Sequence, residues 1–288
     1  MATQSHEARA GLLVVTAVVS VQAGSATATT LFGDVGPAGA VLLRAVFAAA
    51  LLLPFNRIRR SQVTQGKARE LIAFGVALAG MNLCFYESLD RLPLGIAVTL
   101  EFTGPLGVAL AGSRRARDLL WALLAGVGIV LLSGGLGSES IDAVGAAFAL
   151  AAGAFWGAYI LVSAKVGASF PGLGGLAIAL VLSALLVAPF GIAEAGTALF
   201  EPRNLLIGLA VGLLSSAIPY ALELEALRRL RNAVFGVLMS LEPAVAALVG
   251  LIALDQGLSL AEAIAIALVV AASAGALRSG AEPAPRDA

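Results

Sequence analysis

Ten apolar stretches follow one another along this chain of 288 residues, and each is long enough to cross a bilayer. A helix needs about 20 apolar residues to span roughly 30 Å of hydrocarbon. The stretches are 10–31, 37–55, 69–89, 93–112, 118–134, 143–165, 173–193, 204–227, 232–254 and 259–277. Only 12% of the residues are charged, whereas soluble domains carry about 25%. We therefore expect an all-α integral membrane protein with ten transmembrane helices, in contact with the lipid bilayer.

The placement of lysine and arginine predicts how the chain crosses the membrane. With the amino terminus inside, 15 of the 18 Lys and Arg residues fall on the cytoplasmic side, most of them in clusters at 57–69, 114–117 and 228–231. The outer connections carry acids instead, such as Asp34 and Glu194. Because cytoplasmic loops are enriched in basic residues, we expect both termini in the cytoplasm. We also expect the first stretch to be retained as a span rather than cleaved, since nine more follow it.

A weak internal repeat emerges when the chain is shifted by 138 residues against itself, which aligns Pro105 with Pro243. Each half then holds five spans, so the second half enters the membrane in the opposite orientation. Such inverted repeats are typical of secondary transporters, whose substrate sites lie near the membrane midplane between the repeats. We expect one five-helix repeat at 10–136 and another at 143–278. Short cytoplasmic tails remain at 1–9 and 279–288.

Two glutamates lie inside apolar stretches, and each is close to a proline. Glu242 directly precedes Pro243, and Glu101 lies one helical turn before Pro105. A carboxylate at the centre of a span costs about 2.5–3.5 kcal/mol on insertion scales, and a proline inside a helix costs about 3 kcal/mol or more. A chain that carries both penalties twice is expected to use these positions to bind and move a polar substrate.

Proline also changes which backbone groups are free within a span. Because proline has no N–H, the carbonyl four residues earlier loses its helical partner. Pro105 frees the carbonyl of Glu101 in this way, and Pro219 frees that of Ser215. A freed carbonyl at membrane depth must face protein or a watery cavity. The prolines therefore predict helix breaks, either at a binding site or as kinks that only shape the bundle.

The two glutamates and Arg44, which lies in the second stretch, allow several interpretations. Glu101 and Glu242 can bind a substrate ammonium, carry a proton, or pair with Arg44. The Arg44 guanidinium can hold a substrate carboxylate through two parallel hydrogen bonds, or it can be structural. Further candidates for lining a cavity are Gln22, Asn82, Tyr86, Trp156 and Tyr220. Each of these five can equally cross-link two helices.

Glu223 and Glu225 stand near the inner end of their span, beside Arg228 and Arg229. Long charged side chains in such positions reach to the interface. We therefore leave both glutamates out of the predicted site.

The sequence offers no ligand set for a metal and no catalytic group. His6 is the only histidine and Cys84 is the only cysteine, so a thiolate or imidazole cluster is excluded. No stretch combines a nucleophile with a base. We expect no metal, no cofactor, no nucleic-acid partner and no enzymatic activity.

Four segments together resemble the signature of a transporter family. They are the run from Pro93 to Leu110, Met81-Asn82 with Phe85-Tyr86, the segment from Ser216 to Leu222, and the segment from Leu238 to Pro243. These segments are similar to those of bacterial threonine/homoserine exporters. Those proteins are inner-membrane members of the drug/metabolite transporter superfamily, built from two five-helix EamA units. The resemblance extends from about residue 10 to 278.

The resemblance implies efflux of small amino acids across the bacterial inner (plasma) membrane by proton antiport and alternating access. On this basis Glu101, Glu242, Asn82, Tyr86 and Tyr220 become candidates for lining the cavity. A carrier of another metabolite, such as an aromatic amino acid, a nucleobase or a drug-like cation, is the main alternative. An intramembrane lipid-modifying enzyme is an alternative of another class, as is a passive channel.

Overall fold

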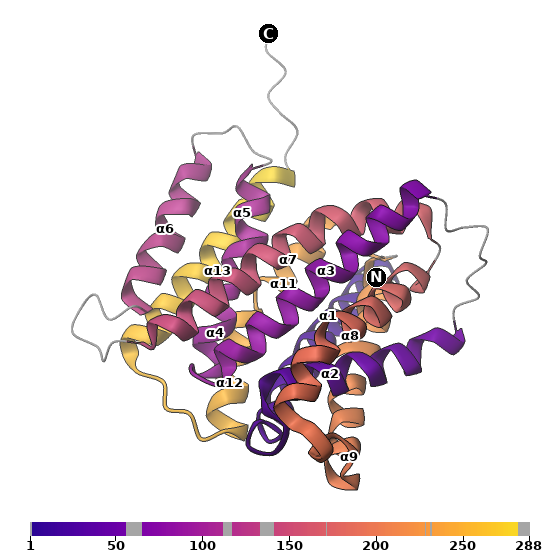
Figure 1. Ribbon diagram of the computed structural model, residues 1–288. Coiled ribbons are helices and arrows are strands. Elements are labelled where there is room, and N and C mark those ends of the chain that lie inside the picture. The colour runs from indigo at the N-terminus through magenta and orange to yellow at the C-terminus, as the bar shows by residue number, and fades with distance from the viewer. Residues whose placement is uncertain are drawn as a thin grey trace.

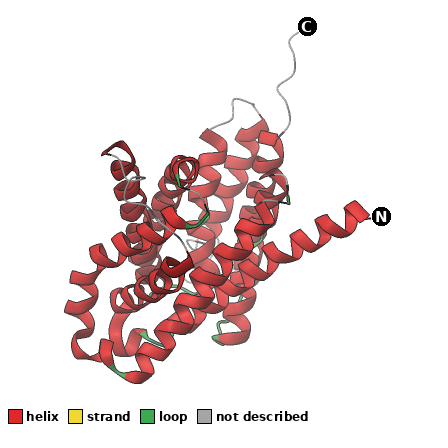
Figure 2. Ribbon diagram, turned by 90° about the vertical axis from the view of Figure 1, so that its right-hand side faces the viewer, coloured by secondary structure: helices red, strands yellow, loops and turns green. Residues whose placement is uncertain are grey.

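The computed structural model describes residues 2–55, 65–111, 117–132, 141–170, 172–227, 229–230 and 232–281. Throughout these ranges every regular element is helical (Figures 1 and 2). The arginine clusters predicted to face the cytoplasm are only partly included, since residues 57–60, 114–115, 228 and 231 fall outside the described ranges. The all-helical prediction is confirmed for the described part of the chain.

The first half of the chain forms a group of long helices with one interrupted member. Its elements are α1 (Ala2–Thr29), α2 (Phe32–Leu52), a 3-10 turn (Leu53–Phe55), α3 (Gln65–Leu89), α4 (Leu94–Glu101), α5 (Thr103–Ala111) and α6 (Arg117–Leu132). The helices α4 and α5 together make one apolar segment that is broken at Phe102.

The second half also consists of helices, with a π-helical turn and a further interruption. Its elements are α7 (Ala143–Ser169), α8 (Gly174–Ala195), a 3-10 turn (Gly196–Phe200), α9 (Pro202–Gly212), a π-helical turn (Leu213–Ala217), α10 (Ile218–Leu227), α11 (Asn232–Met239), α12 (Glu242–Ala253) and α13 (Leu260–Ala281). The break between α11 and α12 begins at Ser240, which lies 138 residues after Phe102.

Eight helical segments among the described residues are long and apolar enough to cross a membrane. Two shorter apolar helices, Leu120–Leu131 and Leu260–Gly275, accompany them. Many large apolar side chains point away from the bundle, including Ile252 at 79% exposure and Leu260 at 78%. In a protein that crosses the bilayer repeatedly, such side chains face lipid rather than water. The chain is therefore a multi-pass membrane protein.

Small residues allow the helices to approach closely, as is usual in membranes. Gly208 and Gly212 lie four residues apart on α9 and face α2. A β-carbon on Gly212 would lie 2.9 Å from that of Phe47 and 3.2 Å from the backbone oxygen of Arg44. This contact brings the middle of α2 against the end of α9, where the π-helical turn begins.

A second close approach lies at the break between α4 and α5. A β-carbon on Gly153 of α7 would lie 2.5 Å from the backbone oxygen of Glu101. We expect Gly153→Val to force α7 away from this break and to destabilise the protein by about 1–3 kcal/mol, the usual cost of overpacking. Thermal unfolding of the detergent-solubilised protein measures this loss. Gly107→Val on α5 is the control, because outside its chain neighbours and the nearby backbone of its own helix no atom lies within 4 Å of its added β-carbon. Equal melting temperatures for the two variants would contradict the expectation.

Candidate functional site

Arg44 lies in the middle of α2 and is only 7% exposed. Its Nε donates to the Ser216 hydroxyl at 3.2 Å, and its Nη2 donates to the Ser215 backbone oxygen at 3.1 Å. Its Nη1 lies 3.5 Å from the Tyr86 hydroxyl. The guanidinium carbon also stands 5.6 Å from the centre of the Tyr86 ring. A buried cation is thus held by neutral groups from α3 and the π-helical turn.

The acceptor on Ser215 is available because of Pro219. The helix widens into a π-helical turn at Leu213–Ala217, so the Ile218 N–H bonds to the Leu213 carbonyl. Proline cannot donate to the carbonyl four residues before it, and the Ser215 oxygen turns to Arg44 instead. A π-helical turn inside an α-helix is often found at a functional site.

The π-helical turn is also fixed from the side of α1. The Ser20 hydroxyl donates to the Leu214 backbone oxygen at 2.6 Å. One turn later, a β-carbon on Gly24 would lie 2.8 Å from the Ser215 backbone nitrogen. The freed carbonyl and the serines that contact Arg44 are therefore held between α1 and α2.

The two acids stand at the two helix breaks, on opposite sides of them. Glu101 is the last residue of α4 and is 7% exposed, whereas Glu242 is the first residue of α12 and is 4% exposed. Glu101 interacts electrostatically with Arg44. However, within the described residues no carboxylate comes within 4.0 Å of the Arg44 nitrogens. Arg44 and Glu101 therefore interact over a longer distance than that of an ion pair.

Glu242 has acidic neighbours and an unsatisfied oxygen. It interacts electrostatically with Glu101 and Glu223. Its Oε2 is buried and has no hydrogen-bond partner among the described residues. A buried polar atom without a partner is costly, and such an atom in a transporter-like bundle is a candidate to receive a proton or a ligand.

Residues from both halves of the chain meet around Arg44. Tyr220 of α10 interacts electrostatically with Arg44 and with Glu242. The first half contributes Arg44, Tyr86 and Glu101, and the second half contributes Ser216, Tyr220 and Glu242. We call these six residues the Arg44 cluster. Five of them were predicted from the sequence as site candidates, and Ser216 was not.

Three predicted site residues have other surroundings. The Asn82 amide donates to the Leu78 carbonyl of its own helix at 2.7 Å. Trp156 packs edge-on against Phe102, with 5.3 Å between ring centres, and so stands beside the break that follows Glu101. The Gln22 side-chain oxygen is buried and finds no partner within the described ranges.

Glu223 was left out of the predicted site, and the structure gives it neighbours in the Arg44 cluster. A side chain that only extends to the membrane interface does not fully account for the position of Glu223. Glu223 is half-buried and interacts electrostatically with Tyr159, Tyr220 and Glu242. Its spacing of three residues from Tyr220 is the signal that could have revealed it, since residues three apart share a helix face. Glu225 does pair with Arg229, as its place beside the basic cluster suggested.

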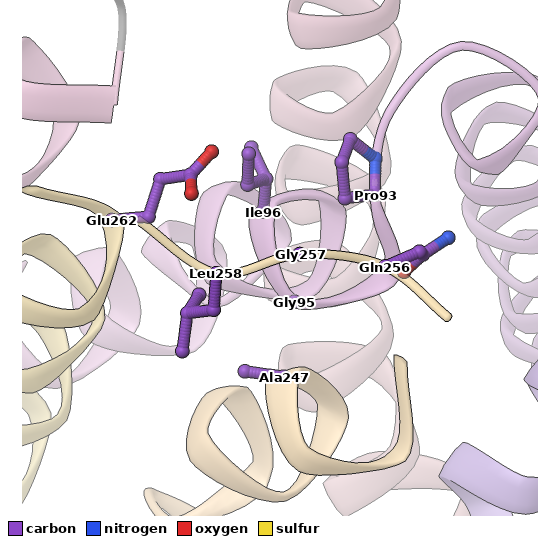
Figure 3. A pocket seen from close by; sticks show the side chains of 8 residues that line it. All are labelled: Pro93, Gly95, Ile96, Ala247, Gln256, Gly257, Leu258 and Glu262. Atoms are coloured by element: carbon purple, nitrogen blue, oxygen red, sulfur yellow. The ribbon is translucent and has the colours of Figure 1, made fainter. Parts of the chain in front are cut away.

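A small hollow lies apart from the Arg44 cluster, at the end of the bundle where α4 begins (Figure 3). Pro93, Gly95 and Ile96 face Ala247 and the loop around Gln256 across it. Six residues separate Gly95 from Glu101, which is about 9 Å along a helix. The hollow is therefore a feature of the loop end and not of the polar cluster.

The chain as a whole is similar to known transporters. Residues 143–278 match the EamA-like transporter family. The threonine/homoserine exporter RhtA of Escherichia coli K12 is 42% identical over 265 residues, covering 92% of this chain and 90% of its own. RhtA of Salmonella typhimurium LT2 matches to the same extent. A crystal structure 21% identical in sequence superposes with a TM-score of 0.64 and covers 96% of this chain and 100% of its own, which shows a shared fold.

Proposed function

Because this chain belongs to the threonine/homoserine exporters among the EamA-like transporters of the drug/metabolite transporter superfamily, we propose that it exports small amino acids across the bacterial inner membrane. The proposed substrates resemble threonine and homoserine, which the names of the relatives specify. The transporter is secondary, coupled to protons, and works by alternating access. The Arg44 cluster, drawn from both halves of the chain, is the observation that carries this proposal.

The proposed topology has ten spans in two inverted repeats, 10–136 and 143–278, with both termini in the cytoplasm. Two features support it. The helix breaks at Phe102 and Ser240 stand at equivalent places in the two halves. The basic residues of the sequence concentrate in the connections that this topology assigns to the inside.

In the proposed complex a zwitterionic amino acid lies between Arg44 and the acids. The guanidinium binds the carboxylate, since it carries a buried positive charge and no carboxylate within 4.0 Å among the described residues. Planar guanidinium groups suit carboxylates geometrically. The ammonium group lies toward Glu101 and Glu242. Tyr86, Tyr220 and Trp156 contribute the walls, and Gln22 and Asn82 line the approach.

The same acids provide the proposed coupling to protons. Glu242 interacts electrostatically with both Glu101 and Glu223. Negative charges brought together in a medium of low dielectric constant repel strongly. A proton or a substrate ammonium relieves that repulsion, and competition between the two makes substrate and proton move in opposite directions. Glu242, with its unpartnered oxygen, is the proposed proton carrier.

Proteoliposomes with an acidic interior test this function. For one proton exchanged per substrate, one pH unit stores about 1.4 kcal/mol and supports about tenfold accumulation. We expect labelled threonine or homoserine to accumulate inside to this extent and to leave when a protonophore is added. Liposomes without protein are the control. Uptake that ignores the pH gradient would refute proton coupling, and no uptake of either amino acid would refute the substrate class.

A further inference from the structure

Three polar links join the two halves of the chain at one end of the bundle. This end lies at the bottom of Figure 1, where α9 and α12 are labelled, and the charge pattern assigns it to the outside. The Glu194 carboxylate accepts from the Ala38 N–H at 2.8 Å, the Gln256 side-chain oxygen accepts from the Leu94 N–H at 2.9 Å, and Arg203 forms an ion pair with Asp34.

The Glu194 carboxylate occupies a position that the start of α2 leaves open for it. Gly36 has a φ of 68° and breaks the helix, and Pro37 follows as the first residue of the regular part. A β-carbon on Gly36 would collide with the Glu194 carboxyl group. The carboxylate of α8 thus takes the place of a side chain on α2. It caps an N–H group that has no partner within its own helix.

Gln256 is held in the same manner at the start of α4. Its backbone N–H donates to the Gly250 carbonyl at 3.1 Å, and a β-carbon on Gly250 would lie 2.6 Å from its side-chain oxygen. The loop that follows is fixed at Ser259 and Glu262, each of which bonds to the backbone N–H of the other. Figure 3 shows Gln256 beside Pro93 and Gly95. Here too, a glycine makes room for a polar side chain from the second half.

Both capped helices lead directly to the Arg44 cluster. Arg44 follows Ala38 by six residues on α2, and Glu101 follows Leu94 by seven residues on α4. At 1.5 Å per residue, each cap lies about 10 Å from the cluster residue on its helix. A displacement of either helix start therefore moves Arg44 or Glu101 relative to the second half.

We propose that Glu194 and Gln256 form an outer gate, in which each side chain holds the start of a first-half helix until substrate is released outward. The proposal rests on the alternating access proposed above. The links suit a gate because the neutral hydrogen bond of Gln256 and the exposed ion pair exchange for bonds to water at little net cost, and the charged bond of Glu194 at a cost of about tenfold or more in an equilibrium constant. Glu194 and Gln256 act through α2 and α4 and are positioning residues.

Labelling of the native Cys84 from either side of the membrane tests the gate. Cys84 is half-buried on α3 and interacts electrostatically with Glu101. In cells expressing the full chain, a membrane-impermeant methanethiosulfonate reagent is added outside. We expect it to label Cys84 about fivefold faster in Gln256→Ala than in the wild type, which is the effect of one neutral hydrogen bond on an equilibrium, and about tenfold faster or more in Glu194→Ala, where the lost bond is to a carboxylate. The double variant should exceed either, since distant effects add.

Two further variants separate gating from a general loss of structure. Glu194→Gln keeps an acceptor oxygen and should restore slow labelling, whereas Glu201→Ala, which removes an exposed carboxylate at the same end, should label like the wild type. Labelling from inverted vesicles should not accelerate in any gate variant. Equal rates for wild type and double variant, or acceleration from both sides, would overturn the gate. Because labelling needs no substrate, gated labelling in a protein that transports no amino acid would refute the proposed function and leave the gate standing.

Discussion

Arg44→Lys is expected to reduce amino-acid transport by about 100-fold or more in kcat/KM, although it keeps the positive charge. The guanidinium donates from three nitrogens toward Ser216, the Ser215 carbonyl and Tyr86. An ammonium group is a compact point charge that cannot reproduce a planar set of donors. A charged hydrogen bond contributes about 1.5–3 kcal/mol, so loss of the fork toward the substrate carboxylate alone accounts for the expected decrease.

Two further variants test whether the effect of Arg44→Lys comes from the lost hydrogen bonds. Ser216→Ala removes one acceptor and leaves the charge, so we expect a smaller loss of about tenfold, in line with one charged hydrogen bond. Arg91→Gln, at an exposed arginine paired with Glu87, should leave transport unchanged. Melting temperature and elution volume in detergent confirm that each variant is folded. Wild-type transport by a folded Arg44→Lys protein would contradict the assignment of Arg44 as a carboxylate ligand.

The helix breaks were predictable because proline acts locally. Pro105 and Pro243 stand next to interruptions at Phe102 and Ser240, and Pro219 follows a π-helical turn. Each consequence depends on the missing N–H of one residue and the carbonyl four positions earlier. Membrane segments were predictable for a similar reason, since bilayer thickness fixes their length.

The partner of the freed carbonyl was not predictable from such local rules. Pro219 predicts that the Ser215 oxygen is free, but Arg44, its partner, lies 171 residues earlier in the chain. That pairing follows from packing of α2 on α9 at Gly208 and Gly212, which no periodicity specifies. The caps supplied by Glu194 and Gln256 were missed because their acceptors and donors lie 156 and 162 residues apart.

Glu223 and Asn82 have surroundings in the structure that their local sequence does not indicate. Glu223 was assigned to the interface because basic residues follow it, yet its spacing from Tyr220 directs it toward the polar cluster. Asn82 was assigned to the cavity because it is polar and lies in an apolar stretch, yet its amide bonds to the helix that carries it. Asparagine commonly competes for backbone carbonyls in this way, so a buried amide is weaker evidence for a site than a buried charge.

Glu242→Gln is expected to abolish accumulation driven by a pH gradient while exchange of labelled for unlabelled substrate continues. Glutamine has the shape of a protonated carboxyl but cannot release a proton, so one half of the antiport cycle is lost. In proteoliposomes with one pH unit across the membrane, accumulation should fall by about tenfold, to the level without a gradient. Gln and Glu have similar helix propensity, and Glu242 opens α12, so we expect the fold to persist.

Glu101→Gln and the double variant complete this test of coupling. Glu101 ends α4 and interacts electrostatically with Arg44, whereas Glu242 interacts electrostatically with Glu101, Glu223 and Tyr220. If Glu242 alone carries the proton, Glu101→Gln should retain gradient-driven accumulation and bind substrate more weakly, which raises KM. Glu101→Gln together with Glu242→Gln should show neither accumulation nor tight binding. Glu201→Gln serves as the control for removal of an exposed carboxylate. Full gradient-driven accumulation by the double variant would exclude both acids from coupling.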